Sequence, residues 1–287
     1  MTYTEDALVE QPAINLFSEL NWDTVTCWDE VFGSLDDAHL ADNPLFFGRE
    51  TRNDVVLFAR LKAALLKLNH DVNSLVIQEA IDQIARDRST MTAISANEEV
   101  YDLLTNGYVY TTNAEDEEDC VVQYIDWSNA SNNDFLLCSQ MSITSEIETR
   151  RPDLIGFING LPLVFIELKA SHKNLLSAYK SNLSDYKNTI PHLFTYNQII
   201  ILSNGVQSKV GSISSQWEHF AEWKKIESEK EDRRVSLEVV IRGICEQNRL
   251  LDIIENYTLF VKAKHTVKII AKYHQYLGVN QALSGLN

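Results

Sequence analysis

The chain has 287 residues, 45% hydrophobic and 23% charged, a composition typical of a globular protein that buries a sizeable core. No apolar run reaches the length of a membrane span, and the first residues lack the basic and apolar regions of a secretory signal. The four cysteines are scattered without the paired spacing of a zinc site, so we expect reduced thiols and a cytoplasmic protein. The net charge of −16 argues by itself against nucleic-acid binding.

Helical patterns dominate the first hundred residues. Apolar residues recur at helical spacing within residues 4–20, where Pro12 either kinks the helix or restarts it. Three more helices are predicted at residues 54–69, 74–86 and 96–107, the last of them ended by a glycine.

Strand patterns begin near residue 120 and then alternate with helices. Strands are predicted at residues 120–127 and 135–143, in a hairpin over 151–171, and at 198–205. A helix is predicted at residues 171–188, and one or two more at residues 235–257. This order predicts a mixed sheet with helices on both faces and with the hairpin at its centre.

The hairpin RPDLIGFINGLPLVFIELKAS is unusual because polar residues stand at its open end. Asp153 begins the first strand, and Glu167 and Lys169 end the second. The Glu-x-Lys triplet alone is a weak signal, since Glu222-Trp223-Lys224 repeats it outside any apolar strand. Glu167 differs because it ends a strand expected to be buried, where ionised groups need partners. Two interpretations stay open: a structural salt bridge of Lys169 with two acids, or a Mg²⁺ site.

The turn of the hairpin decides whether Asp153 can join Glu167 and Lys169, which share one face of their strand. A two-residue Asn159-Gly160 loop places Asp153 on the opposite face, whereas a three-residue loop starting at Ile158 places it beside Glu167. We therefore predict the three-residue loop or an equivalent bulge. With that geometry Asp153 and Glu167 hold the metal, the backbone carbonyl of Leu168 is the third ligand, and Lys169 positions the attacking water.

Pro152-Asp153 and Glu167-Leu168-Lys169 resemble the PD-(D/E)xK nuclease signature. Their surroundings resemble the N-terminal nuclease domain of the type I restriction enzyme R subunit, the motor subunit of that enzyme. The resemblance covers nearly the whole chain and is carried by TEDALVEQPAINLFSELNW, RRPDLIGFINGLPLVFIELK, NLLSAYKSNLSDYKNTIPHLFTYNQIIILSNG, KVGSISSQWEHFAEWK and LLDIIENYTLF.

This resemblance implies an α/β fold with a restriction-endonuclease-like core, a central mixed β-sheet flanked by helices, and an N-terminal helical region. The endonuclease domain is expected over residues 1–260, with a helical part at 1–106, the catalytic sheet core at about 107–215 and C-terminal helices at 235–260. Residues 261–287 resemble the segment that leads into the helicase-like motor domain. The chain is expected to be truncated before that motor domain. The chain contains no P-loop motif, so ATP is expected to bind only the full-length subunit.

The resemblance also implies Mg²⁺-dependent hydrolysis of DNA phosphodiester bonds, with Asp153, Glu167 and Lys169 as the catalytic residues. Glu10 matches an acidic residue on the family's first helix that assists at the metal, and is alternatively a helix-surface carboxylate. Asn182 and Tyr186 match a Gln-x-x-x-Tyr motif of related nucleases, with asparagine in place of glutamine.

Basic residues outnumber acidic ones between residues 149 and 190. The candidate phosphate contacts there are Arg150, Arg151, Lys173 and Lys180, with solvated surface charge as the alternative.

The implied partners are double-stranded DNA and the methyltransferase and specificity subunits of the restriction complex, with no membrane. Activity of the isolated chain is expected to be weak or undetectable. Two other functions stay open: a catalytically silent docking module of the same complex, and a stand-alone PD-(D/E)xK repair nuclease. The motor lead-in argues against the second.

Overall fold

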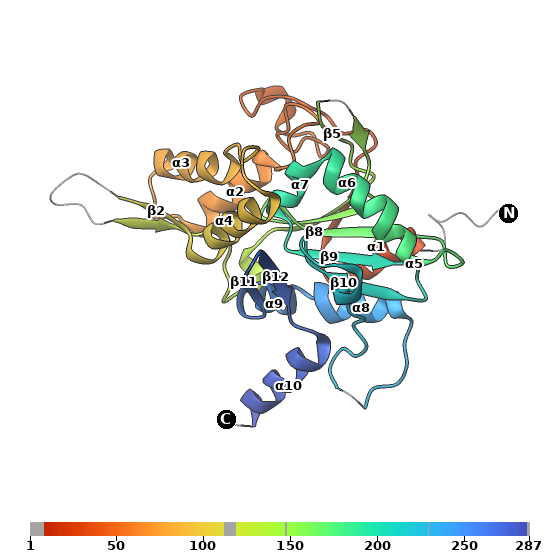
Figure 1. Ribbon diagram of the computed structural model, residues 1–287. Coiled ribbons are helices and arrows are strands. Elements are labelled where there is room, and N and C mark those ends of the chain that lie inside the picture. The colour runs from red at the N-terminus through yellow and green to blue at the C-terminus, as the bar shows by residue number, and fades with distance from the viewer. Residues whose placement is uncertain (1–8, 112–118, 147, 229, 286–287) are drawn as a thin grey trace.

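The computed structural model describes residues 9–111, 119–146, 148–228 and 230–285 (Figure 1). Its centre is a mixed six-stranded sheet in the order β1-β4-β7-β8-β9-β10. The strands are β1 (Asp23–Thr26), β4 (Phe135–Ser139), β7 (Leu154–Ile158), β8 (Leu161–Leu168), β9 (Ile199–Ser203) and β10 (Ser208–Gly211). β1 is parallel to β4 and β8 to β9, whereas the other neighbouring pairs are antiparallel.

Helices cover both faces of this sheet. On the upper face in Figure 1, α7 (Pro191–Tyr196) and a π-helical turn (Ala178–Leu183) contact β8, with α5 (Leu175–Ser177) and α6 (Ser184–Thr189) on either side of that turn. On the other face, α1 (Gln11–Glu19) packs against α8 (Ser236–Cys245). The predicted α/β fold, a central mixed sheet flanked by helices, is confirmed.

The remaining elements lie around this core. They are α2 (Phe58–Leu68), α3 (Ser74–Ala85), α4 (Ala93–Asn106), β2 (Tyr108–Tyr110), β3 (Cys120–Val122), β5 (Ile143–Thr144), β6 (Thr149–Arg150), α9 (Gln247–Asn256), β11 (Thr258–Lys262), β12 (Thr266–Ile270) and α10 (Tyr273–Ser284). β2 pairs with β3, β5 with β6 and β11 with β12, each as a separate two-stranded ladder. In Figure 1, α10 projects from the body towards the C-terminus.

Several sequence predictions can be compared with these elements. Pro12 lies in the first turn of α1, where a missing N–H costs little, and Val9 and Glu10 before it are already helical. β9 is buried along its whole length, as its continuous apolar run predicts. β1 was not predicted, because Asp-Thr-Val-Thr is short and mostly exposed and has no apolar alternation. The strand predicted at residues 120–127 is shorter and lies outside the central sheet.

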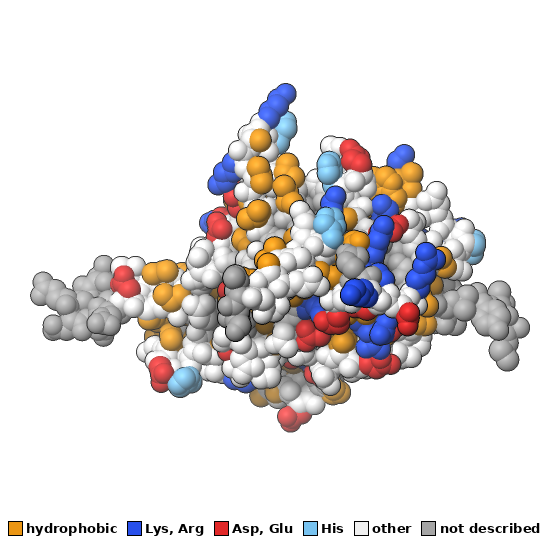
Figure 2. Space-filling view, turned by 90° about the horizontal axis from the view of Figure 1, so that it is seen from below, with side chains coloured by type: hydrophobic (Ala, Val, Ile, Leu, Met, Phe, Trp, Pro, Cys, Tyr) orange, Lys and Arg blue, Asp and Glu red, His pale blue; other side chains and the backbone are white. Residues whose placement is uncertain are grey.

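The cysteines and the charged surface are both as the amino-acid composition suggested. All four cysteines are free, as expected. On the face seen from below, basic side chains lie next to acidic ones (Figure 2). One example of such pairing is Arg242 with Glu19 and Glu238. Within the described residues, no helix is both long and apolar enough to cross a membrane.

Candidate active site

The turn of the central hairpin is a two-residue loop. Ile158 pairs with Leu161, so the predicted three-residue loop is wrong. Asn159 and Gly160 both have positive φ, 50° and 77°, which is the backbone of the type I′ turn that Asn-Gly favours. Asn159 is fully buried, and its side-chain amide donates to the Tyr124 carbonyl at 2.8 Å, which fixes the turn in the core.

A β-bulge corrects the register within the same hairpin. Phe157 pairs with Pro162, but Gly156 pairs with Val164, so one extra residue lies in β8. Proline has no N–H to give to the ladder, and inside sheets it is confined to edges, strand starts and bulges. Beyond the bulge Leu154 pairs with Ile166, the last pair of this ladder, and Asp153 and Glu167 are the next residues at that end. The predicted equivalent bulge is therefore confirmed.

The three residues at the open end of the hairpin lie close together. The side chain of Glu167 is 1% exposed, and the Lys169 ammonium donates to its Oε1 at 2.7 Å. The main-chain N–H of Leu168 donates to Asp153 Oδ2 at 2.7 Å. Two carboxylates and an amine therefore lie where β7 begins and β8 ends. The bulge sets the register of β8 against β7, and this register decides on which face of the sheet these charged side chains lie.

Glu10 reaches this end of the sheet through a residue that the sequence patterns did not predict. Gln140 follows β4, and its Nε2 donates to both carboxylate oxygens of Glu10, at 2.9 and 3.1 Å. The main-chain N–H of Gln140 donates to the carbonyl of Asp153 at 3.1 Å. Gln140 has φ 57°, the left-handed conformation that costs a non-glycine residue about 1–2 kcal/mol. No local pattern marks Gln140, because its partners come from distant segments.

The helix after the hairpin brings Asn182 and Tyr186 to the same region. Tyr186 is buried, its ring packs edge-on against Phe165, and its hydroxyl donates to the Arg151 carbonyl at 3.4 Å. Burial raises the pKa of Tyr186, and the negative charges of Glu167 and Asp153 raise it further. Asn182 hydrogen-bonds Tyr186 and lies in the π-helical turn, a feature frequent at functional sites.

The four candidate phosphate contacts differ in their surroundings. The Arg150 guanidinium bonds both carboxylate oxygens of Asp185, at 2.5 and 3.1 Å, and also pairs with Glu148. Arg151 is exposed and bonds the hydroxyl of Ser142. Lys173 and Lys180 are exposed. Arg150 therefore has two acidic partners. Among the described residues, no carboxylate forms an ion pair with Arg151.

The donor set at this site suits one kind of metal. Among the residues that the structure describes, no group of three or more His, Cys, Asp or Glu side chains is arranged to hold an ion. The carboxylates of Asp153 and Glu167 supply oxygen ligands, and one or two carboxylates together with water and phosphate are a common set for Mg²⁺. The residues present therefore fit Mg²⁺, and they lack the thiolate and imidazole ligands of zinc sites.

The family model and the similar curated proteins all point to type I restriction enzymes. The family model described as the type I restriction enzyme R protein N terminus matches residues 2–219. The HindI endonuclease subunit of Haemophilus influenzae, a type I restriction enzyme, is 34% identical over 84% of this chain and 24% of its own length. The putative MjaIXP endonuclease subunit of Methanocaldococcus jannaschii is 27% identical over 84% of this chain and 25% of its own length. The chain thus spans about a quarter of these relatives. It belongs to the family of type I restriction enzyme R protein N-terminal regions.

Proposed function

We propose that this chain is the Mg²⁺-dependent nuclease domain of a type I restriction enzyme R subunit and hydrolyses DNA phosphodiester bonds. The observation that carries the proposal is the bulge in β8, beyond which Asp153 bonds the Leu168 N–H and Lys169 bonds Glu167 at the same end of the hairpin. The bulge changes the register by one residue and so favours Asp153 and Glu167 on the same face of the hairpin, where they could share one metal ion. The relatives named above are endonuclease subunits, which supports the same conclusion.

Asp153 and Glu167 would hold Mg²⁺, with the Leu168 carbonyl as a third ligand and Glu10 assisting from its position directly before α1. The ion would supply charge neutralisation at the scissile phosphate and would lower the pKa of a bound water. Burial of Glu167 in β8 keeps its carboxylate in place, and the Leu168 N–H orients the carboxylate of Asp153. Gln140 holds Glu10 at the edge of the site through two hydrogen bonds.

Lys169 would position the attacking water and stabilise charge as the water oxygen bonds to phosphorus and the bond to the leaving sugar oxygen breaks. Its ammonium lies 2.7 Å from Glu167 Oε1, so it is fixed at the site before DNA arrives. A charge in place beforehand stabilises the transition state without costly reorganisation. Tyr186, buried beside both acids, would keep water away from their inner side.

The partners follow from the family. Double-stranded DNA would be the substrate, and the methyltransferase and specificity subunits of a cytoplasmic restriction complex would recognise the target. ATP would bind elsewhere in the full-length R subunit. The net charge of −16 disfavours tight DNA binding by this chain alone, which is consistent with weak activity in isolation.

Plasmid cleavage by the assembled complex tests the proposal. Asp153→Asn and Lys169→Met, each in the full-length R subunit, are expected to lower the cleavage rate by about 10²–10³-fold. Glu222→Gln and Lys224→Met change the matching Glu-x-Lys triplet outside the site and should cut at the parental rate. ATP hydrolysis measured on the same complexes shows that each has assembled. Parental cleavage by both site variants would exclude the catalytic assignment.

A second function is favoured by one observation. Lys169 already neutralises Glu167, and the described residues hold no larger cluster of metal ligands. The domain would then be a catalytically silent docking module. In that case the Asp153 and Lys169 variants would cleave normally, and any loss of activity would accompany a loss of subunit assembly.

A further inference from the structure

An exposed tryptophan lies beside Arg151 at the candidate active site. Trp28 follows Cys27, whose N–H donates to the Ser139 carbonyl at the end of β4, directly before Gln140. The Trp28 side chain is 61% exposed, and the guanidinium carbon of Arg151 lies 3.8 Å from the centre of its ring. Arg151 is two residues before Asp153 in the chain. The stacked pair therefore stands at the end of the sheet that carries the carboxylates.

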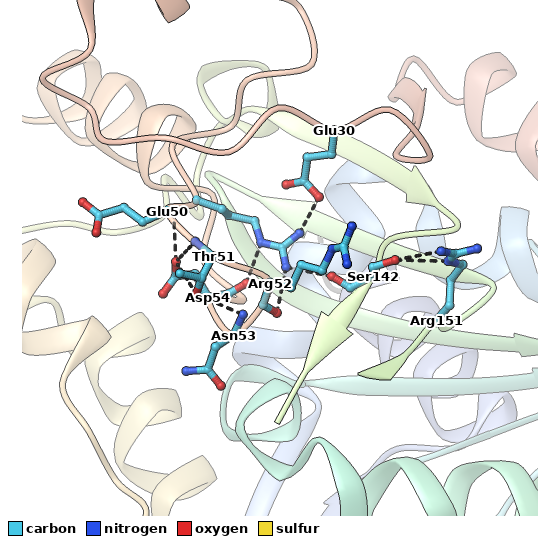
Figure 3. Close-up of polar contacts among 9 residues, drawn as sticks. Glu30, Glu50, Thr51, Arg52, Asn53, Asp54, Ser142 and Arg151 are labelled. Carbon is cyan, nitrogen blue, oxygen red and sulfur yellow. Dashed lines mark hydrogen bonds and ion pairs between the residues drawn. The ribbon is translucent and has the colours of Figure 1, made fainter. Parts of the chain in front are cut away.

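A second set of contacts holds Arg151 from the other side. Its Nε and Nη2 donate to the hydroxyl of Ser142 at 3.2 and 3.0 Å (Figure 3). The carbonyl of Ser142 accepts a hydrogen bond from Arg49 at 2.9 Å. Arg49 in turn forms an ion pair with Glu30 at 2.6 Å, and both side chains are almost fully buried. Because Glu30 lies two residues after Trp28, this buried pair anchors the loop that carries the tryptophan.

The charge of Arg151 is left available by this arrangement. Ser142 and Trp28 are neutral, and among the described residues no carboxylate forms an ion pair with Arg151. Its neighbour Arg150, by contrast, is compensated by Asp185 and Glu148. A guanidinium that is already ordered loses little further entropy on binding, and its planar fork matches a phosphate group.

We propose that Arg151 binds a backbone phosphate of DNA beside the cleavage position, and that Trp28 is a positioning residue that holds the guanidinium in place. This inference rests on the proposed function, because it takes DNA as the substrate. The ligand is a phosphate because the group presented is a cationic planar guanidinium, which matches the charge and the oxygens of a phosphate. Of the two arginines, Arg151 therefore offers an ordered charge without a carboxylate partner among the described residues, whereas Asp185 and Glu148 compensate Arg150.

The salt dependence of DNA binding tests this assignment. The 287-residue chain carrying Asp153→Asn, which prevents cutting, is titrated with a short fluorescent duplex at KCl concentrations from about 50 to about 200 mM. Each phosphate contact contributes about 0.9 to the slope of log affinity against log salt for duplex DNA. Arg151→Gln is expected to reduce the slope by about one contact, whereas Arg150→Gln should leave it at the parental value.

Trp28 is tested on the same duplex. Trp28→Leu keeps the charge of Arg151 and removes its support, so the slope should stay unchanged while affinity falls about two- to fivefold, the value of an exposed cation–π contact. Trp28→Phe should recover part of the loss. Equal thermal midpoints confirm that the variants are folded, as expected for an exposed side chain.

The outcomes separate this inference from the catalytic assignment. A parental slope for Arg151→Gln, an equal decrease for Arg150→Gln, or no duplex binding by the parent chain at low salt overturns the phosphate contact. Parental affinity of Trp28→Leu overturns the positioning role. None of these measurements depends on cleavage, so failure of the nuclease mechanism is detected separately by the plasmid assay.

Discussion

Replacing Lys169 with methionine removes one partner of a buried ion pair while roughly keeping the length of the side chain. The Glu167 side chain is 1% exposed and lies 2.7 Å from the lysine ammonium. Leaving one member of a buried pair uncompensated costs about 3–5 kcal/mol in unfolding free energy. The lysine is 17% exposed, so water reaches the vacated position and we expect a loss near the lower end, about 3 kcal/mol.

Mg²⁺ should reverse part of this loss if Asp153 and Glu167 are its ligands. A ligand at a hundredfold excess over its dissociation constant stabilises the folded state by about 2.7 kcal/mol. The increment should be larger for Lys169→Met than for the parent, because the ion then also replaces the missing positive charge. Adding Glu167→Gln to the variant should abolish the increment.

Urea denaturation with EDTA or with Mg²⁺ measures both effects without any cleavage assay. Lys224→Met is the matched control, since this lysine belongs to the similar triplet outside the site. A Lys169→Met variant as stable as the parent in EDTA would refute the importance of the ion pair. Equal Mg²⁺ increments with and without Glu167 would refute the metal site.

Three further predictions concern the frame of the site and a buried lysine. Gly160→Ala should lower the unfolding free energy by about 1–3 kcal/mol, because its φ is 77° and a Cβ would come 2.6 Å from the Leu57 carbonyl. Gly278→Ala, where nothing lies within 4 Å, should not destabilise the protein. Gln140→Gly should be about 1 kcal/mol more stable than Gln140→Ala, since both lose the bonds to Glu10 but only glycine tolerates the left-handed backbone. Burial lowers the pKa of Lys187 from 10.5 to about 8, so the unfolded chain binds more protons between these values and the parent should gain stability as pH rises from 8 to 10.5. Lys187→Met should lack that gain.

Each of these predictions has a result that contradicts it. Equal urea midpoints for the two glycine variants would show that the Asn159-Gly160 turn tolerates a side chain. A Gln140→Ala variant as stable as Gln140→Gly would mean that the left-handed backbone stores no strain. Parallel stability curves for Lys187→Met and the parent between pH 8 and 10.5 would place the lysine ammonium in water.

The local sequence was sufficient for most of the secondary structure near the site. Continuous apolar runs predicted β8 and β9 because strands covered on both faces bury every side chain. Pro12 marked the start of α1, and the motif residues were correctly expected at the open end of the hairpin. A bulge was predicted as one of two ways to place Asp153 on the same face of the hairpin as Glu167. Pro162 in β8 is a local signal for the position of this bulge.

Contacts between distant segments were decided by the tertiary structure. Gln140 and Glu10 are 130 residues apart, and no pattern in either segment predicts their hydrogen bonds. Trp28 lies under Arg151 only because β1 joins the sheet beside β4, a pairing that its short polar sequence does not indicate. The amino-acid sequence alone indicated the candidate residues of the site and the strands that are apolar along their whole length, since both depend on neighbours in the chain. The register of the hairpin and the support of each charged group depend on packing between segments, and only the folded protein fixes them.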